Sequence, residues 1–237
     1  DPLVKEYEGV LNNFANELFG KGEIKDIYQD LDFSERLTQI YIDSGKVHNQ
    51  YFDFSLPQTG IKYDTPMWHG PAVFNVLTCP QLLDVVESVI GSEIYCNPVQ
   101  HVRFKPPEQY APLNEDGSVQ FGATKWHQDN GVVNEDADET DMLTVWVPVW
   151  DASEEDGCLH LVPKSHKDGL NVHCPIEGTV AMPDDVFKKQ DAISIPMKRG
   201  SVLLMHRLTC HGSLPNLSER IRWSLDLRYN PIGQSSG

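Results

Sequence analysis

The segment IRWSLDLR, residues 221–228, alternates apolar and polar side chains along its whole length. Successive side chains of a β-strand point to opposite faces, so this period of two predicts a strand with one apolar and one polar face. If packed helices cover the apolar face, the polar face lines an internal cavity; the alternative is a polar face that simply meets water. The apolar face carries Ile221, Trp223, Leu225 and Leu227, and the polar face carries Arg222, Ser224, Asp226 and Arg228.

Other short, β-like segments accompany this strand from about residue 93 onward. Clusters of Pro, Gly, Asn and Asp separate them, as is typical of turns between strands. The strand candidates are residues 93–105, 142–150, 159–163, 192–196, 201–206 and 222–229.

The first part of the chain has a different pattern. Apolar side chains recur at intervals of three and four residues over 3–18, which predicts a helix that Gly20 ends. A second helix is expected after Ser34. A third is expected over 80–90, because Pro80 suits a first turn and Gly91 suits a C-terminal cap.

Length and charge narrow the class of protein. The chain has 237 residues, with 19 Lys and Arg against 35 Asp and Glu, so its formal charge is −16. Such a surface repels phosphate backbones and anionic lipid heads, and no run approaches the length of apolar residues that a membrane span needs. We therefore expect no nucleic-acid partner and no membrane contact. We predict a single domain over 1–237, with a mostly helical support region over 1–92 and a β core over 93–230.

The cysteines indicate the compartment. There are five of them, widely scattered, and no pair has CxxC spacing. This pattern argues against a disulfide framework and against a zinc knuckle. Because nothing near residue 1 resembles a signal peptide, we expect a reducing, cytoplasmic location.

The segment WHQD, residues 126–129, places an imidazole and a carboxylate two positions apart. Side chains at that spacing on an extended segment lie on one side, so His127 and Asp129 could bind one ion together. His211 is the best candidate for a third ligand. Two histidines and one carboxylate form the ligand set of non-haem Fe(II) oxygenases, whereas the HExxH form that is typical of zinc hydrolases does not occur.

Four blocks together resemble the phytanoyl-CoA dioxygenase family. They are WHQD at 126–129, TVWVP at 144–148, DGCLHLVPKSH at 156–166, and HGS at 211–213 followed by Asn216, Ser218 and Arg222. The resemblance covers roughly residues 95–230. It implies a mainly β fold, a double-stranded β-helix (a jelly-roll, cupin-like barrel), and an Fe(II)- and 2-oxoglutarate-dependent oxygenase that also uses O2.

The family pattern also implies roles for individual residues. The iron ligands would be His127, Asp129 and His211, and Arg222 would bind the distal carboxylate of 2-oxoglutarate, with Ser213 beside it. Trp146 would form a wall of the cosubstrate pocket and Gln100 would lie near the cosubstrate. Core packing explains Trp146 equally well, a plain strand position explains Gln100, and Arg220 competes with Arg222 for the carboxylate.

The predicted reaction is hydroxylation, or another oxidation, of an unactivated C–H bond of a small molecule, with release of succinate and CO2. Because the acid Asp129 is present, we expect oxygenation and not halogenation. Arg103, Lys105 and Arg228 are candidate cations for an anionic group of the substrate. The acidic run over 134–141 is either a solvated loop or a lid, and as a lid it would disfavour coenzyme A thioesters.

Two other classes of function stay open. A non-catalytic β-helix module could keep the motif for ligand binding, and a zinc-dependent hydrolase could use the same triad. The intact set of His127, Asp129, His211 and Arg222 argues against the first, and the second leaves Arg222 without a purpose.

Overall fold

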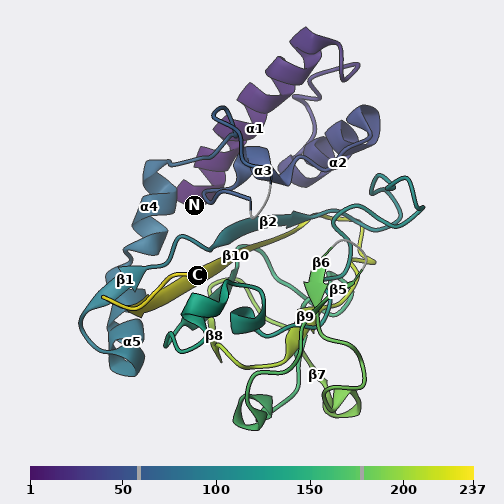
Figure 1. Cartoon of the computed structure of the whole chain (residues 1–237). Helices are drawn as coiled ribbons and strands as arrows, with labels where there is room; N and C mark the ends of the chain where they lie inside the picture. The colour runs from purple at the N-terminus through teal and green to yellow at the C-terminus, as the bar shows by residue number, and fades with distance from the viewer. Residues whose placement is uncertain (58–59, 177–178) are drawn as a thin grey trace.

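A computed structural model describes residues 1–57, 60–176 and 179–237. Figure 1 shows a layer of helices from the N-terminal part of the chain lying against a set of β-sheets. The helices are α1 (Pro2–Lys21), α2 (Phe33–Ser44), α3 (Asn49–Phe52), α4 (Pro71–Leu77) and α5 (Pro80–Ile90). The strands are β1 (Ile94–Cys96), β2 (His101–Lys105), β3 (Leu143–Pro148), β4 (Leu159–Leu161), β5 (Cys174–Ile176), β6 (Thr179–Ala181), β7 (Ile193–Ile195), β8 (Leu203–His206), β9 (His211–Ser213) and β10 (Arg222–Pro231).

The three predicted helices are confirmed as α1, α2 and α5, with one error at a boundary. The first helix passes through Gly20 and ends at Gly22, which has the left-handed backbone conformation, φ 71°, that glycine adopts without strain. A glycine within the last turn costs only about 1 kcal/mol, so Gly20 alone does not stop a helix whose apolar stripe is buried. At the other end, the Asp1 side chain accepts hydrogen bonds from the first backbone N–H groups.

The stretch Pro71–Ile90 is long and apolar enough, by length and composition, to cross a membrane. Its mean hydropathy is 1.4 and 11% of it is buried. Such a stretch is weak evidence for a membrane span, because it can also occur in a helix that packs on a folded domain. Here the backbone leaves the helix at Thr78 and Cys79 and starts again at Pro80, so that α4 and α5 are separate and each is far shorter than the roughly 20 residues of a span.

β10 organises the largest sheet. The described strands form a five-stranded sheet with the order β1-β10-β3-β8, in which β2 also pairs with β10. A three-stranded sheet has the order β7-β4-β9, and β5 pairs with β6; every pairing is antiparallel. A single bridge between His127 and His211 adds the WHQD segment to the edge of β9.

The strand predictions are confirmed, except that one predicted strand is in fact two strands and that three short strands were not predicted. The expected strand over 93–105 is two strands, β1 and β2, because Pro98 and its neighbours interrupt the ladder between them. β5, β6 and β9 were not predicted. Each has three residues and lacks the alternation of large apolar and polar side chains that the equally short β4 (Leu-His-Leu) and β7 (Ile-Ser-Ile) show.

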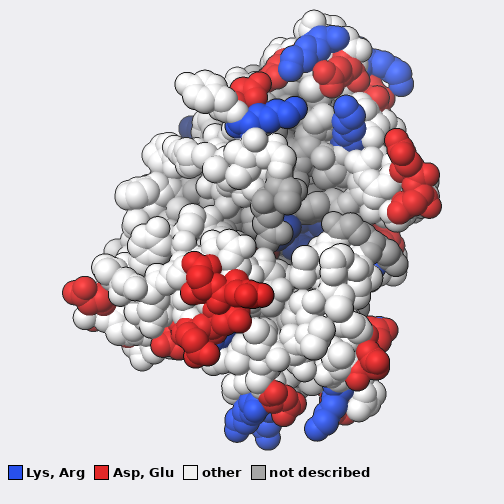
Figure 2. All heavy atoms as spheres, viewed as in Figure 1, with Lys and Arg blue, Asp and Glu red and all other residues white. Residues whose placement is uncertain are grey.

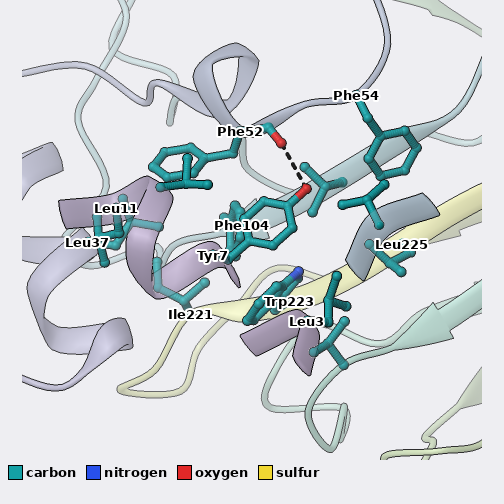
Figure 3. Packing of buried hydrophobic residues seen from close by; sticks show 14 of the residues in the cluster. Leu3, Tyr7, Leu11, Leu37, Phe52, Phe54, Phe104, Ile221, Trp223 and Leu225 are labelled. Carbon is teal, nitrogen blue, oxygen red and sulfur yellow. Dashed lines mark hydrogen bonds between the residues drawn. The ribbon is translucent and has the colours of Figure 1, made fainter. Parts of the chain in front are cut away.

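The apolar face of β10 forms the main core with α1 and α2. Trp223 stacks on Phe33 with ring centroids 5.2 Å apart, and Tyr7 meets Trp223 edge to face, also at 5.2 Å. The Tyr7 hydroxyl donates a hydrogen bond to the carbonyl of Phe52, 3.0 Å away (Figure 3). Helices cover this face, so the condition for an inward polar face is met: Arg222, Asp226 and Arg228 line an internal pocket. The alternative, a polar face that meets water, does not hold for these residues.

Replacing Trp223 by alanine should lower the free energy of unfolding by about 3–5 kcal/mol, because a fully buried aromatic side chain leaves a cavity between two layers. Urea denaturation monitored by circular dichroism measures this change. Phe19→Ala is the matched control, since Phe19 is 50% exposed and its loss should have little effect. Equal losses in the two variants would contradict the placement of Trp223 at the centre of the core.

Candidate metal centre and adjoining pockets

The structure brings His127, Asp129 and His211 together. One ligand atom from each lies within 4.8 Å of the others, and Nε2 of His211 is 4.0 Å from Oδ2 of Asp129. The imidazole centroids are 4.2 Å apart. Asp129 and His211 are buried, and His127 is partly buried. This spacing suits three ligands on one face of a single metal ion.

Backbone carbonyls orient the two imidazoles. Nδ1 of His127 is 2.9 Å from the Lys125 carbonyl, and Nδ1 of His211 is 2.9 Å from the Thr209 carbonyl. A carbonyl oxygen only accepts, so each Nδ1 carries the proton and donates it, which leaves the Nε2 lone pair for a metal. Burial lowers the pKa of His127 to about 3, with a further lowering from His211, so this imidazole is neutral at physiological pH.

Asp129 is held as a carboxylate by its surroundings. Its Oδ2 accepts a 2.6 Å hydrogen bond from the Thr144 hydroxyl, and its Oδ1 is paired with the Arg228 guanidinium. Burial by itself raises the pKa of Asp129, but Arg228, the two imidazoles and Thr144 together hold it below its usual range. A carboxylate beside two imidazoles whose Nε2 atoms face it is a complete donor set for a divalent transition metal, so the residues fit such an ion.

Two buried cations adjoin these donors. Arg222 is 3% exposed and Lys105 is 1% exposed. Within the described part of the chain, neither forms an ion pair, and Nε of Arg222 has no hydrogen-bond partner. Burial lowers the pKa of Arg222 to about 10 and lowers the pKa of Lys105 well below its usual range. Unpaired buried cations are costly, so this cluster is suited to an anion from outside the chain.

Ser213 and Trp146 lie at the same cluster. The Ser213 hydroxyl is 2.6 Å from Nζ of Lys105, which donates to it. The guanidinium carbon of Arg222 lies 5.7 Å from the centroid of the Trp146 ring, and Trp146 lines the metal pocket at 2% exposure. Trp146 therefore serves both the pocket wall and a small apolar cluster with Leu159 and Met205.

The remaining predicted site residues lie elsewhere or have other partners. Gln100 does not line the metal pocket, and its amide is hydrogen-bonded to the Cys96 thiol, 3.4 Å away, so the structure does not bring it to the site. Arg228, expected to face a substrate anion, is engaged by Asp129 and by the Val99 carbonyl. Arg220 is paired with Asp156 through bonds of 2.8 and 2.9 Å, which removes it as a competitor for Arg222.

Several residues that orient the ligand segments were not predicted from the sequence. Thr144 shares a strand face with Trp146, and that spacing of two was the signal available for it. Gln128 is fully buried: its side chain donates to the carbonyls of Gly169 and Leu208, and its backbone N–H donates to Nε2 of His173. Nothing local in the sequence predicts these contacts, because the partners come from distant loops.

Gly212 lets the two ligand segments approach each other. A Cβ at this position would lie 2.7 Å from the Thr124 carbonyl oxygen and 2.8 Å from Nε2 of His160. The Thr124 backbone N–H donates to the Ser213 hydroxyl, and the Ser213 N–H donates to the Thr124 carbonyl. The absence of a side chain between His211 and Ser213 is therefore a requirement of the close backbone contact.

Lys105→Met should stabilise the ligand-free protein by about 1–3 kcal/mol near neutral pH, because it removes a buried amine whose protonated form, present in the unfolded chain, is disfavoured by burial. Lysine normally has a pKa of 10.5, and the folded state depresses it. Between these two pKa values the unfolded chain holds the extra proton, so wild-type stability rises with pH and the gap to the variant closes as pH approaches 10.5.

Urea unfolding of both ligand-free proteins across the neutral and alkaline range measures the gap. Lys189→Met, which removes an exposed lysine paired with Asp184, is the control and should show no such convergence. A gap that stays constant, or a destabilised variant, would contradict the depressed pKa of Lys105.

A family model described as phytanoyl-CoA dioxygenase (PhyH) matches residues 53–224. This match covers most of the chain and includes all three candidate metal ligands and Arg222. The chain belongs to the phytanoyl-CoA dioxygenase family. The resemblance of the four sequence blocks is thereby confirmed.

Curated relatives of this family member include a 1-deoxypentalenic acid 11-beta-hydroxylase of Streptomyces exfoliatus, 26% identical over 195 residues. That match takes in 75% of this chain and 60% of the relative, so the chain spans only part of the relative's length. A phytanoyl-CoA dioxygenase of Arabidopsis thaliana is 36% identical over 105 residues, which are 43% of this chain and 36% of the relative.

Solved structures support the fold. EvdO2 from Micromonospora carbonacea var. aurantiaca has a TM-score of 0.55 and 22% identity, covering 70% of this chain and 66% of its own. The epimerase SnoN, solved with Fe3+, alpha ketoglutarate and nogalamycin RO, has a TM-score of 0.54 and 20% identity, covering 71% of this chain and 63% of its own. The mainly β, jelly-roll class of this family member is thus confirmed.

Proposed function

We propose that this member of the phytanoyl-CoA dioxygenase family is an Fe(II)- and 2-oxoglutarate-dependent dioxygenase. It would oxidise an unactivated C–H bond of a small molecule, with release of succinate and CO2. The observation that carries the proposal is the position of two buried basic side chains, Arg222 and Lys105, beside three metal-ligating side chains; neither has a carboxylate partner among the described residues.

The donor set suits the iron and the cosubstrate. His127, Asp129 and His211 would hold Fe(II) and leave positions open for 2-oxoglutarate and O2. Arg222 would bind the distal carboxylate through two parallel hydrogen bonds, and Lys105 and Ser213 would complete that subsite. The names of the relatives support this assignment, since a hydroxylase is among them and one solved neighbour contains Fe3+ and alpha ketoglutarate.

The protein's own part in the reaction is binding, orientation and exclusion of water. When bound, the iron and the cosubstrate supply the oxidising chemistry. Thr144 and Arg228 fix the Asp129 carboxylate, and the two backbone carbonyls fix the imidazoles. The apolar side chains of Trp146 and Met205 line the same pocket and keep it dry.

Other features support the remaining expectations. All five cysteines are free thiols, which supports a reducing, cytoplasmic location. In the outer part of the site, Glu135 from the acidic run lines a cavity, which supports a small molecule over a coenzyme A thioester. A zinc hydrolase would have no use for Arg222 and Lys105, and a binding module without catalysis would not need a pair of imidazoles oriented by backbone carbonyls.

One assay tests the proposal. Purified protein is incubated with Fe(II), ascorbate and 2-oxoglutarate under air, with and without a metabolite library, and succinate is measured. We expect succinate that depends on both iron and 2-oxoglutarate and increases with the correct substrate. Tightly bound zinc and no succinate under any condition would favour the hydrolase, and neither signal would favour the binding module.

A further inference from the structure

A second cavity opens directly onto the metal pocket. Its volume is about 430 Å³, within the range of small-molecule sites, and it shares Arg103, Thr124, His127 and Arg228 with the metal pocket. Since His127 is a candidate iron ligand, a molecule in this cavity would lie against the metal. The cavity is therefore the place where a substrate would bind.

Among the described lining residues, the acid and the two arginines of this cavity have partners, and one of them, an arginine, keeps both terminal amino groups free. Asp53 accepts hydrogen bonds from the backbone N–H groups of Phe54 and Val102 and from Nδ1 of His101, 2.8 Å away. Arg228 is engaged by Asp129, as described above. Asp53 is the one carboxylate among the described lining residues, and it has no oxygen left without a partner for an ammonium group.

Arg103 is this arginine. Its Nε donates to Oδ2 of Asp226, 2.8 Å away, and its guanidinium carbon lies 5.8 Å from the centroid of the Phe121 ring. The two terminal amino groups make no hydrogen bond with any described residue, and the side chain is 30% exposed. A guanidinium held through Nε, with both terminal groups free, presents a two-pronged donor that matches a carboxylate.

The charge of the whole site favours an anion. Four cations (Arg103, Lys105, Arg222 and Arg228) line or border the metal pocket, against the two carboxylates of Asp129 and Asp226. The two positive charges of a divalent metal ion and the two negative charges of a dicarboxylate cosubstrate cancel each other. The loaded site therefore stays positive, even with Lys105 neutral. Figure 2 shows Lys or Arg atoms in the depth of a hollow on the face drawn there.

The outer wall of the cavity is largely apolar, although His69 and Glu135 also line it. A third cavity, of about 850 Å³, continues from it and shares Pro57, Val99, Val132 and Val180. The side chains of Phe54, Leu56, Ile61 and Met67 also line this outer space. A bound molecule would thus meet a cation near the metal and hydrocarbon further out.

We propose that the substrate is an apolar carboxylic acid, whose carboxylate binds the terminal amino groups of Arg103 and whose carbon skeleton extends toward Val99, Val132 and Val180. This inference rests on the proposed function and adds the substrate class. The engaged state of Asp53 disfavours zwitterionic amino acids. Among the described lining residues Arg103 is the one cation with both terminal amino groups free, which favours one carboxylate over several.

Calorimetric titration of the protein loaded with Zn(II) and saturating 2-oxoglutarate tests the inference without turnover. The probes are octanoate, cyclohexanecarboxylate and 1-adamantanecarboxylate, each compared with its neutral primary amide. We expect at least one acid to bind about tenfold or more tightly than its amide, as a charge-assisted hydrogen bond implies. Equal binding of acid and amide for every skeleton, or no binding of any acid, would overturn the inference.

Variants identify the cation. Arg103→Met should reduce the preference for acid over amide to about one, and Arg103→Met/Asp226→Asn should do the same without leaving Asp226 unpaired. Arg199→Met, which removes an exposed arginine paired with Asp1, should keep the preference. A preference that persists in both Arg103 variants would overturn the assignment. The titration with 2-oxoglutarate that precedes each experiment separates the two proposals, because failure to bind it refutes the proposed function itself.

Discussion

Asp129→Asn should lower the affinity for Fe(II) by at least about a hundredfold and abolish iron-dependent succinate formation. Loss of a residue that hydrogen-bonds to a metal ligand typically lowers the affinity for the metal by about 10- to 100-fold, so loss of a ligand itself should lower it further. The amide keeps the shape of the side chain but loses the charge that Arg228 and the metal share. Metal content after dialysis against a weak chelator, together with succinate release, measures both effects.

Stability has to be separated from metal binding in this experiment. Asp129 is 1% exposed and paired with Arg228, so its replacement leaves a buried cation and weakens the fold. Asp129→Asn/Arg228→Met removes that problem and should still fail to bind iron. Asp141→Asn is the matched control, because Asp141 pairs with Arg207 on the exposed acidic loop and should keep wild-type iron content. Wild-type iron content and turnover in Asp129→Asn would refute the ligand assignment.

Arg222→Gln should raise the KM for 2-oxoglutarate by about 30- to 150-fold, the equivalent of losing a charge-assisted pair of hydrogen bonds worth about 2–3 kcal/mol. The residual affinity would come from chelation of the metal and from Lys105. The ligand-free variant should be no less stable than the wild type, because the lost cation has no anionic partner among the described residues. Initial rates of succinate formation at varied 2-oxoglutarate and fixed iron measure this KM.

Arg220→Gln is the control for this variant. Arg220 lies two positions earlier, with a half-exposed side chain bonded to Asp156, so its loss should cost some stability and leave the KM for 2-oxoglutarate unchanged. An increase in KM in Arg220→Gln together with a normal KM in Arg222→Gln would reverse the assignment of the two arginines.

The strand IRWSLDLR shows which features of a protein a local sequence pattern can predict. Its period of two was enough to predict the strand and both of its faces, because side-chain alternation follows from backbone geometry alone. The same rule identified His127 and Asp129 as neighbours on one side. It could not predict β5, β6 or β9, three-residue strands in which apolar and polar side chains do not alternate, and it could not predict that α1 ends at Gly22 and not at Gly20.

Contacts between side chains of different helices and strands could not be predicted from the sequence. Lys105 and Arg228 were both expected to face the substrate as cations. Arg228 is engaged by Asp129 across a separation of 99 residues, and Lys105 meets Ser213 across 108. Such partners depend on which strands pair and in which register, and a single sequence does not contain that information in any local form.

The sequence by itself determined the fold class, the family and the types of donor available, because these depend on local periodicity and on short blocks in a constant order. Only the tertiary structure decided which cations have carboxylate partners. Arg228 pairs with Asp129 and Arg220 pairs with Asp156. Within the described residues, the buried Lys105 and Arg222 form no ion pair, and the terminal amino groups of Arg103 make no hydrogen bond. The physical reason is that the effect of a charge depends on its burial and its neighbours, which the packing of distant segments creates.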